Sequence, residues 1–204
     1  DLFKWIDRFY DSFDLKKAFQ TAEKFDLDVT KRFKALSKGY QSIVKLTAAL
    51  ALNVPYVIFD EPVLGLDANH RELFYNLLLK NFEDNDQTII IATHLIEEVA
   101  NIIEEVVLID KGKLLLQENV DTLLERGYCI SGLAEEVDSY CKDKNVIGND
   151  ELGGLKLSYI IGEKTKLPQG SHLQITRMNL QKLFIKLTEK GGMNDEKITY
   201  PYSV

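Results

Sequence analysis

The stretch from Tyr56 to Asp67, YVIFDEPVLGLD, decides the fold of this chain. Its four leading apolar residues stand between Pro55 and Pro62 and predict a short strand covered on both faces, as in a parallel α/β sheet. Such a strand ends with Asp60 and Glu61 at the carboxyl edge of the sheet, where open α/β sheets bind their ligands.

The paired acids suggest a metal ion and a water molecule. Asp60 is the type of ligand that Mg²⁺ takes, since this ion binds one or two carboxylates together with substrate phosphates. Glu61 is then available to orient or deprotonate an attacking water. An acid pair alone is more often the solvated end of a strand, so the flanking sequence has to decide between the two interpretations.

Length and composition limit the possible classes of protein. The 204 residues are 45% hydrophobic, enough for one core or one and a half domains. The net charge of -7 and the pI of about 5.1, without a basic stripe, argue against a nucleic-acid partner. The apolar runs fall far short of the ~18 residues that cross a bilayer. Cys129 and Cys141 are expected to be reduced thiols in the cytosol.

Ser37 precedes a long apolar helix and stands where an N-cap belongs. The free N–H groups and the positive dipole end of that helix favour an anion. Gly39 allows a phosphate to approach closely, and the Ser37 hydroxyl can donate to it. Taken alone, the pair is equally a cap and a turn residue.

A second strand follows the first after a helix. Asp67 is the predicted N-cap of that helix, and residues 88–93 form a β-rich run that ends at His94. Two parallel strands joined by a helix deliver the acid pair and His94 to the same edge. A lone histidine is usually structural, but one beside two acids is a better candidate to contact a phosphate or position a water.

Four segments together resemble the motifs of ABC-type ATPases. Residues 36–41 resemble the signature motif, 57–62 the Walker B motif, 64–67 the D-loop and Thr93-His94 the switch histidine. They occur in the order found in the family, and the resemblance covers about residues 1–127.

The resemblance implies an α/β fold that is the C-terminal part of a P-loop NTPase (ABC ATPase) core with its helical subdomain. Residues 1–127 would form this partial domain, with the helical subdomain and signature in 1–52 and the Walker B to H-loop segment and a hairpin in 53–127. We expect a small α+β appendage in 128–190 and a loose tail in 191–204.

The resemblance also implies roles for single residues. Asp60 would support Mg²⁺ through water, Glu61 would be the catalytic base, and His94 would sense the γ-phosphate of ATP. The nucleotide-contacting positions would be Ser37, Lys38, Gly39, Gln41 and Asp67. Ser37 and Gly39 would bind ATP held by the opposite protomer, and Asp67 would communicate across the dimer.

The sequence departs from the family pattern in two ways. The signature has Lys38 and Tyr40 where Gly and Gln are commonest, a variant that resembles the signature of exporter ATPases. A Walker A loop is absent: the only Gly-Lys pair, Gly112-Lys113, lacks the preceding glycine and is followed by Leu114. We therefore expect an N-terminal portion to be missing; the alternative, a pseudoenzyme, conflicts with the intact Glu61 and His94.

The predicted function is that of an ATP-binding and hydrolysing subunit of an ABC transporter of the exporter type, from a branch that handles drugs and peptide antibiotics. The expected partners are a second ATPase subunit and a separate transmembrane permease, with no nucleic acid. The protein would then lie in the cytoplasm at the inner face of the cell membrane. The alternative is a soluble ABC ATPase that acts on ribosomes or DNA. The 204 residues as given are expected to bind ATP weakly or not at all.

Periodicity predicts the remaining elements. Helices are expected within residues 2–25 and over 95–105, 120–126, 133–144 and 179–190, strands over 106–110, 113–117, 128–130, 155–161 and 173–176. The aromatic residues near the N-terminus predict a small helical core, with exposure to a partner helix as the alternative.

Overall fold

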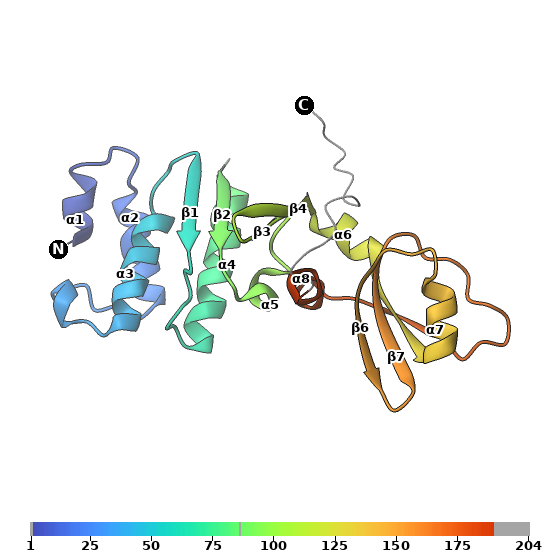
Figure 1. Ribbon diagram of the computed structural model, residues 1–204. Helices are drawn as coiled ribbons and strands as arrows, with labels where there is room; N and C mark the ends of the chain where they lie inside the picture. Colours follow the sequence, from blue (N-terminus) through green and yellow to red (C-terminus); the bar gives the residue numbers. More distant parts are fainter. Residues whose placement is uncertain (1, 86, 190–204) are drawn as a thin grey trace. The chain divides into compact units, whose positions relative to one another are not determined.

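A computed structural model describes residues 2–85 and 87–189 (Figure 1). The chain divides into two compact units, Asp1–His94 and Leu95–Val204, and each is considered by itself. Parts of the predicted Asn85-Asp86 turn and the whole predicted tail of 191–204 lie outside the described residues.

The first unit begins with three helices and a 3₁₀ turn: α1 (Leu2–Asp7), α2 (Leu15–Lys24), η1 (Phe33–Ala35) and α3 (Lys38–Leu50). Asp14 caps α2, and Ser37 caps α3 as predicted by accepting a bond from the Tyr40 N–H at 3.3 Å. The interior of this part is made by small and aliphatic residues of α2 and α3, among them Ala18, Ala22, Ile43, Val44 and Leu46.

The predicted aromatic core at the N-terminus is largely wrong. Phe3 is buried, at 3% exposure, and packs edge-on against Phe19 with ring centroids 5.9 Å apart. Trp5, Phe9 and Tyr10 are all more than half exposed. The reason is geometric, since a six-residue helix turns only one narrow face toward its neighbours.

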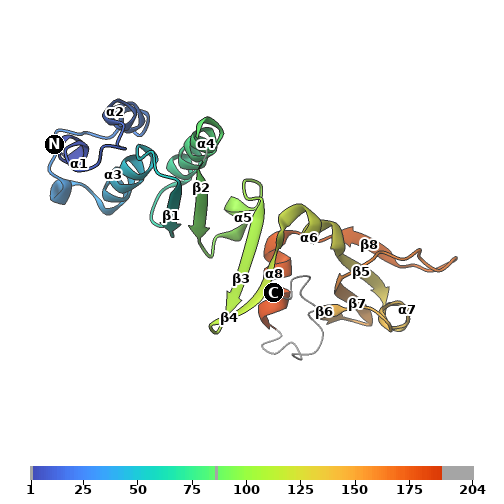
Figure 2. The same cartoon turned by 90° about the horizontal axis from the view of Figure 1, so that it is seen from above.

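Two parallel strands and a helix follow. β1 (Tyr56–Asp60) pairs with β2 (Thr88–Ala92), and α4 (Ala68–Asp84) connects them (Figures 1 and 2). The register places Asp60 opposite Ala92, so both strands end at the same edge. Phe59 packs on Phe74 of α4 with ring centroids 5.4 Å apart. The predicted parallel pair with its connecting helix is therefore confirmed.

The expectation that the first strand is covered on both faces is wrong for the described residues. Phe59 is 5% exposed, but Tyr56 and Ile58 are 70% and 69% exposed, and Ile90 of β2 is 48% exposed. The sheet they form has two strands, and α4 covers only the face that carries Phe59.

A buried polar network fixes the start of both strands. The Gln87 side-chain amide donates to the carbonyl oxygens of Leu52 and Val54, at 3.1 and 2.8 Å, and accepts from Asn81 of α4 at 3.0 Å. Lys17 of α2 bonds the same Asn81. The network joins α2, α4 and the segments that precede β1 and β2, and so positions the strand ends.

The second unit combines a hairpin, a four-stranded antiparallel sheet and four helices among its described residues. The sheet order is β6-β7-β5-β8. The elements are α5 (Ile96–Val99), β3 (Glu105–Asp110), β4 (Lys113–Asn119), α6 (Val120–Arg126), β5 (Gly127–Leu133), α7 (Ala134–Cys141), β6 (Val146–Leu152), β7 (Leu155–Ile161), β8 (Gln174–Arg177) and α8 (Leu180–Glu189).

Most of these elements agree with the predictions, and two do not. The β3–β4 hairpin turns at Lys111 and Gly112, which both have positive φ, 49° and 76°. The helix expected over 95–105 covers only Ile96–Val99, and Glu105 already begins β3. β6 was not predicted: it is an edge strand whose acidic second half is exposed, so it lacks a clear apolar alternation.

The hairpin shares one core with the C-terminal elements. Leu108 of β3 clusters with Leu123, Tyr159 and Leu183. This shared core explains why the compact unit begins at Leu95, whereas the sequence places a domain boundary after Gly127. That the ATPase-like domain ends at Gly127 stays a prediction.

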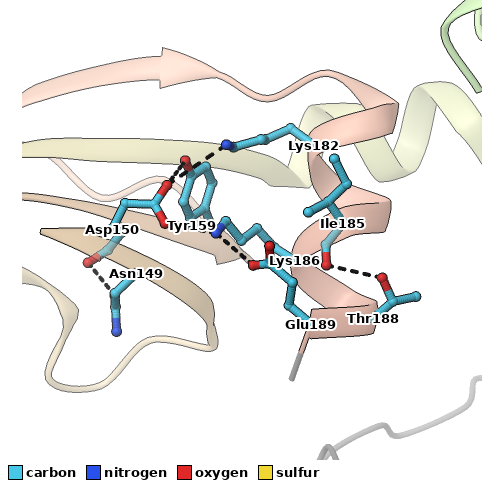
Figure 3. A network of polar contacts seen from close by, with 9 residues as sticks. Asn149, Asp150, Tyr159, Lys182, Ile185, Lys186, Thr188 and Glu189 are labelled. Carbon is cyan, nitrogen blue, oxygen red and sulfur yellow. Dashed lines mark hydrogen bonds and ion pairs between the residues drawn. The ribbon is translucent and has the colours of Figure 1, made fainter. Parts of the chain in front are cut away.

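An ion-pair network attaches α8 to this sheet (Figure 3). Lys186 Nζ lies 2.8 Å from Asp150 Oδ1 and 2.8 Å from Glu189 Oε2, and the Tyr159 hydroxyl donates to Asp150 Oδ2 at 2.6 Å. The ammonium groups of Lys182 and Lys186 lie 5.1 and 5.0 Å from the centre of the Tyr159 ring. The Asp150 carboxylate thus accepts a hydrogen bond from Tyr159 and pairs with Lys186 and Lys182. We call the group formed by Asp150, Tyr159 and Lys186 the α8 anchor.

Candidate functional site

Glu61 leaves β1 in an unusual backbone conformation. Its φ is 45°, in the left-handed region that L-residues other than Gly, Asn and Asp rarely adopt. Its N–H still donates to the Ala92 carbonyl at 2.8 Å, so the parallel ladder continues one residue beyond Asp60. The side chain reaches the residues that follow β2, and backbone strain of about 1–2 kcal/mol is typical of functional sites.

The carboxylate of Glu61 is held by the two residues that follow β2. Its Oε2 accepts from the Thr93 hydroxyl at 3.0 Å, and its Oε1 accepts from the His94 N–H at 3.1 Å and lies 2.7 Å from His94 Nδ1. The ring of His94 lowers the pKa of Glu61 most, ahead of the opposing effect of desolvation. Glu61 is therefore ionised at neutral pH and can accept a proton or a hydrogen bond.

The ring of His94 remains accessible on its other side. Its side chain is 65% exposed, and Nδ1 is engaged with Glu61. This leaves Nε2 as the ring atom that can meet a phosphate oxygen, to which it donates when it carries a proton.

Asp60 lies beside this group and does not contribute to the hydrogen bonds of Glu61. It ends β1 and is exposed to solvent. A single exposed carboxylate at a strand end fits a Mg²⁺ ion that takes its other ligands from water and phosphates. Within residues 2–85 and 87–189, no group of three or more acidic, His or Cys side chains is arranged to hold a metal.

The signature segment forms the start of α3. Lys38 is exposed, whereas the Gln41 amide turns back and donates to the Leu36 carbonyl at 2.9 Å. A Cβ atom on Gly39 would lie 3.4 Å from the Gly65 carbonyl oxygen, so this segment and the loop before α4 are in contact. The structure therefore brings the signature segment to the predicted D-loop.

Asp67 caps α4 and is bonded by a residue that the sequence analysis did not single out. The Asp67 Oδ1 atom accepts from the His70 N–H at 3.0 Å, and Oδ2 lies 2.6 Å from His70 Nδ1. The i,i+3 spacing from an N-cap carboxylate was the available signal. Thr93, a strand-end residue named in the motif, also gains a specific contact, to Glu61.

The predicted site residues thus fall into two groups within the first unit. Glu61 and His94 come together at the ends of β1 and β2, next to Asp60 in the chain. Ser37, Lys38, Gly39 and Gln41 lie at the start of α3, and the loop that carries Asp67 approaches them through Gly65.

Comparisons with known proteins identify similar sequences and a similar fold. No family model matches the chain. The energy-coupling factor transporter ATP-binding protein EcfA2 of Mycoplasmoides gallisepticum is 40% identical over 80 residues, which cover 39% of this chain and 25% of that protein. EcfA2 of Bacillus thuringiensis (strain Al Hakam) is 28% identical over 159 residues, 77% of this chain and 48% of the relative.

The ABC transporter ATP-binding protein YtrB of Bacillus subtilis (strain 168) is 23% identical over 149 residues, 72% of this chain and 51% of that protein. The chain is thus similar in sequence to ABC transporter ATP-binding proteins. It spans a quarter to about half of the length of these relatives.

A solved structure supports the fold assignment. The structure of an ATP-binding subunit of an ABC transporter superposes with a TM-score of 0.50 at 20% identity, covering 54% of this chain and 46% of the other. The predicted fold class, an α/β ABC-ATPase core with its helical part, is confirmed, and an α+β portion follows it. No helix of the described residues has both the length and the apolar composition of a membrane span.

Proposed function

We propose that the complete protein is the ATP-binding and ATP-hydrolysing subunit of an ABC transporter. One observation carries the proposal: the Glu61 carboxylate, on a strained backbone, is held by His94 at the edge where two parallel strands end. A carboxylate that is ionised, solvent-accessible and fixed by hydrogen bonds is suited to orient and deprotonate a water.

Each residue of the site has a distinct part in this proposal. Glu61 accepts the proton of the attacking water, and His94 fixes Glu61 through Nδ1 while Nε2 meets the γ-phosphate. Asp60 would hold Mg²⁺ through water, and the ion would neutralise charge on the phosphates. In a head-to-tail pair, the N–H groups at the start of α3, with Ser37 and Gly39, would contact ATP on the second subunit.

The change Glu61→Gln in the complete protein tests the proposed base. The amide keeps the size of the side chain but cannot take up a proton, so we expect kcat for ATP hydrolysis to fall by at least about 100-fold. Binding of ATP, measured by calorimetry, should persist. Glu72→Gln, an exposed acid on α4, is the matched control and should leave kcat unchanged. Hydrolysis at the normal rate in Glu61→Gln would remove Glu61 from this role.

The partners are part of the same proposal. We infer a second ATPase subunit from the family resemblance, in which the signature residues contact ATP held by the opposite protomer, and a separate transmembrane permease that places the protein at the cytoplasmic face of the membrane. Co-purification with a membrane protein supports this, whereas co-sedimentation with ribosomes supports the alternative. The 204 residues alone should bind ATP weakly, since their sequence holds no Walker A loop.

The direction of transport rests on the signature variant with Lys38 and Tyr40, which favours export. Two of the relatives are named as energy-coupling factor transporter proteins, and this name does not indicate export. The direction of transport therefore has to be measured. ATP-driven transport in vesicles of known orientation decides it: net movement away from the face that carries the ATPase supports export, and movement toward that face contradicts it.

A further inference from the structure

His70 occupies both oxygens of the Asp67 carboxylate. An N-cap acid needs only one oxygen to satisfy a helix N–H. Here the His70 N–H takes Oδ1 at 3.0 Å, and the ring of the same residue takes Oδ2 at 2.6 Å. An ionised carboxylate only accepts hydrogen bonds, so the ring must carry its proton on Nδ1. These two bonds, the backbone bond first, lower the pKa of Asp67 and keep it ionised.

The ring of His70 also reaches the signature helix. Its centroid lies 5.9 Å from that of Tyr40 on α3, at an interplanar angle of 68°, and 6.0 Å from that of Phe25 at the end of α2. The side chain of His70 is only 24% exposed, and Phe25 is fully buried. The ring therefore packs between two helices of the first unit and turns one polar edge to Asp67.

This ring contact lies alongside a backbone contact between the same two segments. Gly39, next to Tyr40, approaches the Gly65 carbonyl, two residues before Asp67. The bond from the His70 N–H to Asp67 would form with any side chain at position 70. An aromatic ring without a nitrogen could pack against Tyr40 but could not bond Asp67. His70 supplies both at the point where the signature segment meets the loop before α4.

We propose that His70 is a positioning residue that fixes the Asp67 carboxylate and ties it to Tyr40, so that the signature segment and the Asp67 loop move together. The inference rests on the proposed function, in which these two segments face the nucleotide of a partner subunit. A carboxylate bonded at both oxygens cannot rotate freely, so its orientation follows the position of the His70 ring.

Two substitutions in the complete protein separate the two properties of His70. His70→Phe keeps a ring against Tyr40 and Phe25 but has no donor, and His70→Asn keeps a donor near the position of Nδ1 but has no ring. We expect His70→Phe to lower kcat for ATP hydrolysis about tenfold, with KM for ATP and the Tm nearly unchanged. His70→Asn keeps the bond to Asp67 but loses the contact with Tyr40, so it should recover only part of kcat. Asn69→Ala, an exposed neighbour in the same helical turn, is the control and should match the wild type.

The inference is overturned if His70→Phe hydrolyses ATP at the wild-type rate, if His70→Asn is equally impaired, or if kcat falls only in step with the Tm. A wild-type protein without ATPase activity would instead contradict the proposed function. A second measurement then decides the inference without ATP. Long-range ¹H–¹⁵N spectra of the imidazole at pH 8 should show the proton of His70 on Nδ1, and a proton on Nε2 would refute the bond to Asp67.

Discussion

Glu61 follows the end of β1 in the first unit, and Asp150 lies within β6 in the second. Each carboxylate binds one hydroxyl and one basic side chain. Glu61 receives Thr93 at 3.0 Å and His94 at 2.7 Å, and Asp150 receives Tyr159 at 2.6 Å and Lys186 at 2.8 Å. The pKa of each acid is lowered chiefly by its basic partner. By hydrogen-bond distance the two groups are nearly the same.

Their surroundings differ in what remains accessible. The basic partner of Glu61 is 65% exposed, and Glu61 itself has a left-handed backbone. The basic partner of Asp150, Lys186, is 8% exposed, and its stem lies where a Cβ on Gly148 would be 2.7 Å away. An exposed partner such as His94 can contact a ligand while it holds the carboxylate, whereas a buried partner such as Lys186 serves to hold the fold together.

Removal of Lys186 should have the largest effect on stability. Lys186→Met keeps most of the apolar stem but takes the ammonium from both Asp150 and Glu189. We expect a loss of about 2–3 kcal/mol in the free energy of unfolding, below the range for fully buried pairs because Asp150 is half exposed. Urea unfolding and hydrogen exchange of the α8 amides measure it.

Lys182 is the matched control for that experiment. It lies over the same Tyr159 ring and 3.8 Å from the same carboxylate, but its side chain is 43% exposed. Lys182→Met should therefore cost less than about 0.5 kcal/mol. Equal losses for the two variants would show that burial does not distinguish the α8 anchor from a surface ion pair.

Acid should weaken the α8 anchor with a defined sign. The pKa of Asp150 is depressed by its bond to Lys186, so its contribution is full above the unfolded value of about 3.9 and is lost as the pH falls through the folded value. Asp150→Asn lacks this contribution, worth about 1 kcal/mol for a half-exposed acid. The stability gap between wild type and variant should be constant from about pH 7 to 5 and shrink below about pH 4. A gap that widens in acid would contradict the assignment.

The sequence could predict the features whose interacting groups are close together in the chain. The strand that ends in Asp60 and Glu61, the caps Ser37 and Asp67, and the turn at Lys111 each depend on residues within a few positions of one another, and the structure places them as expected. Local chemistry determines these features because the interacting groups are neighbours in the chain.

The parallel pair that brings Glu61 to His94 was predicted, but other features that depend on distant partners escaped prediction. Lys186 binds Asp150 from 36 positions away, and the edge strand that carries Asp150 has no apolar alternation to reveal it. Exposure of Trp5 follows from how few neighbours α1 has, which the aromatic composition alone does not tell. The bond of His70 to the N-cap Asp67 could have been predicted from their i,i+3 spacing, but its contact with Tyr40 joins two helices and could not.

A last substitution tests whether the Glu61 site is built for function at some cost in stability. Glu61→Gly removes three hydrogen bonds of an accessible side chain but relieves a left-handed backbone that glycine adopts freely. The two changes oppose each other, so the free energy of unfolding should shift by less than about 1 kcal/mol while ATP hydrolysis is lost. If Glu61→Gly instead costs as much as Lys186→Met, then Glu61 is part of the structural framework and the contrast between the two carboxylates does not hold.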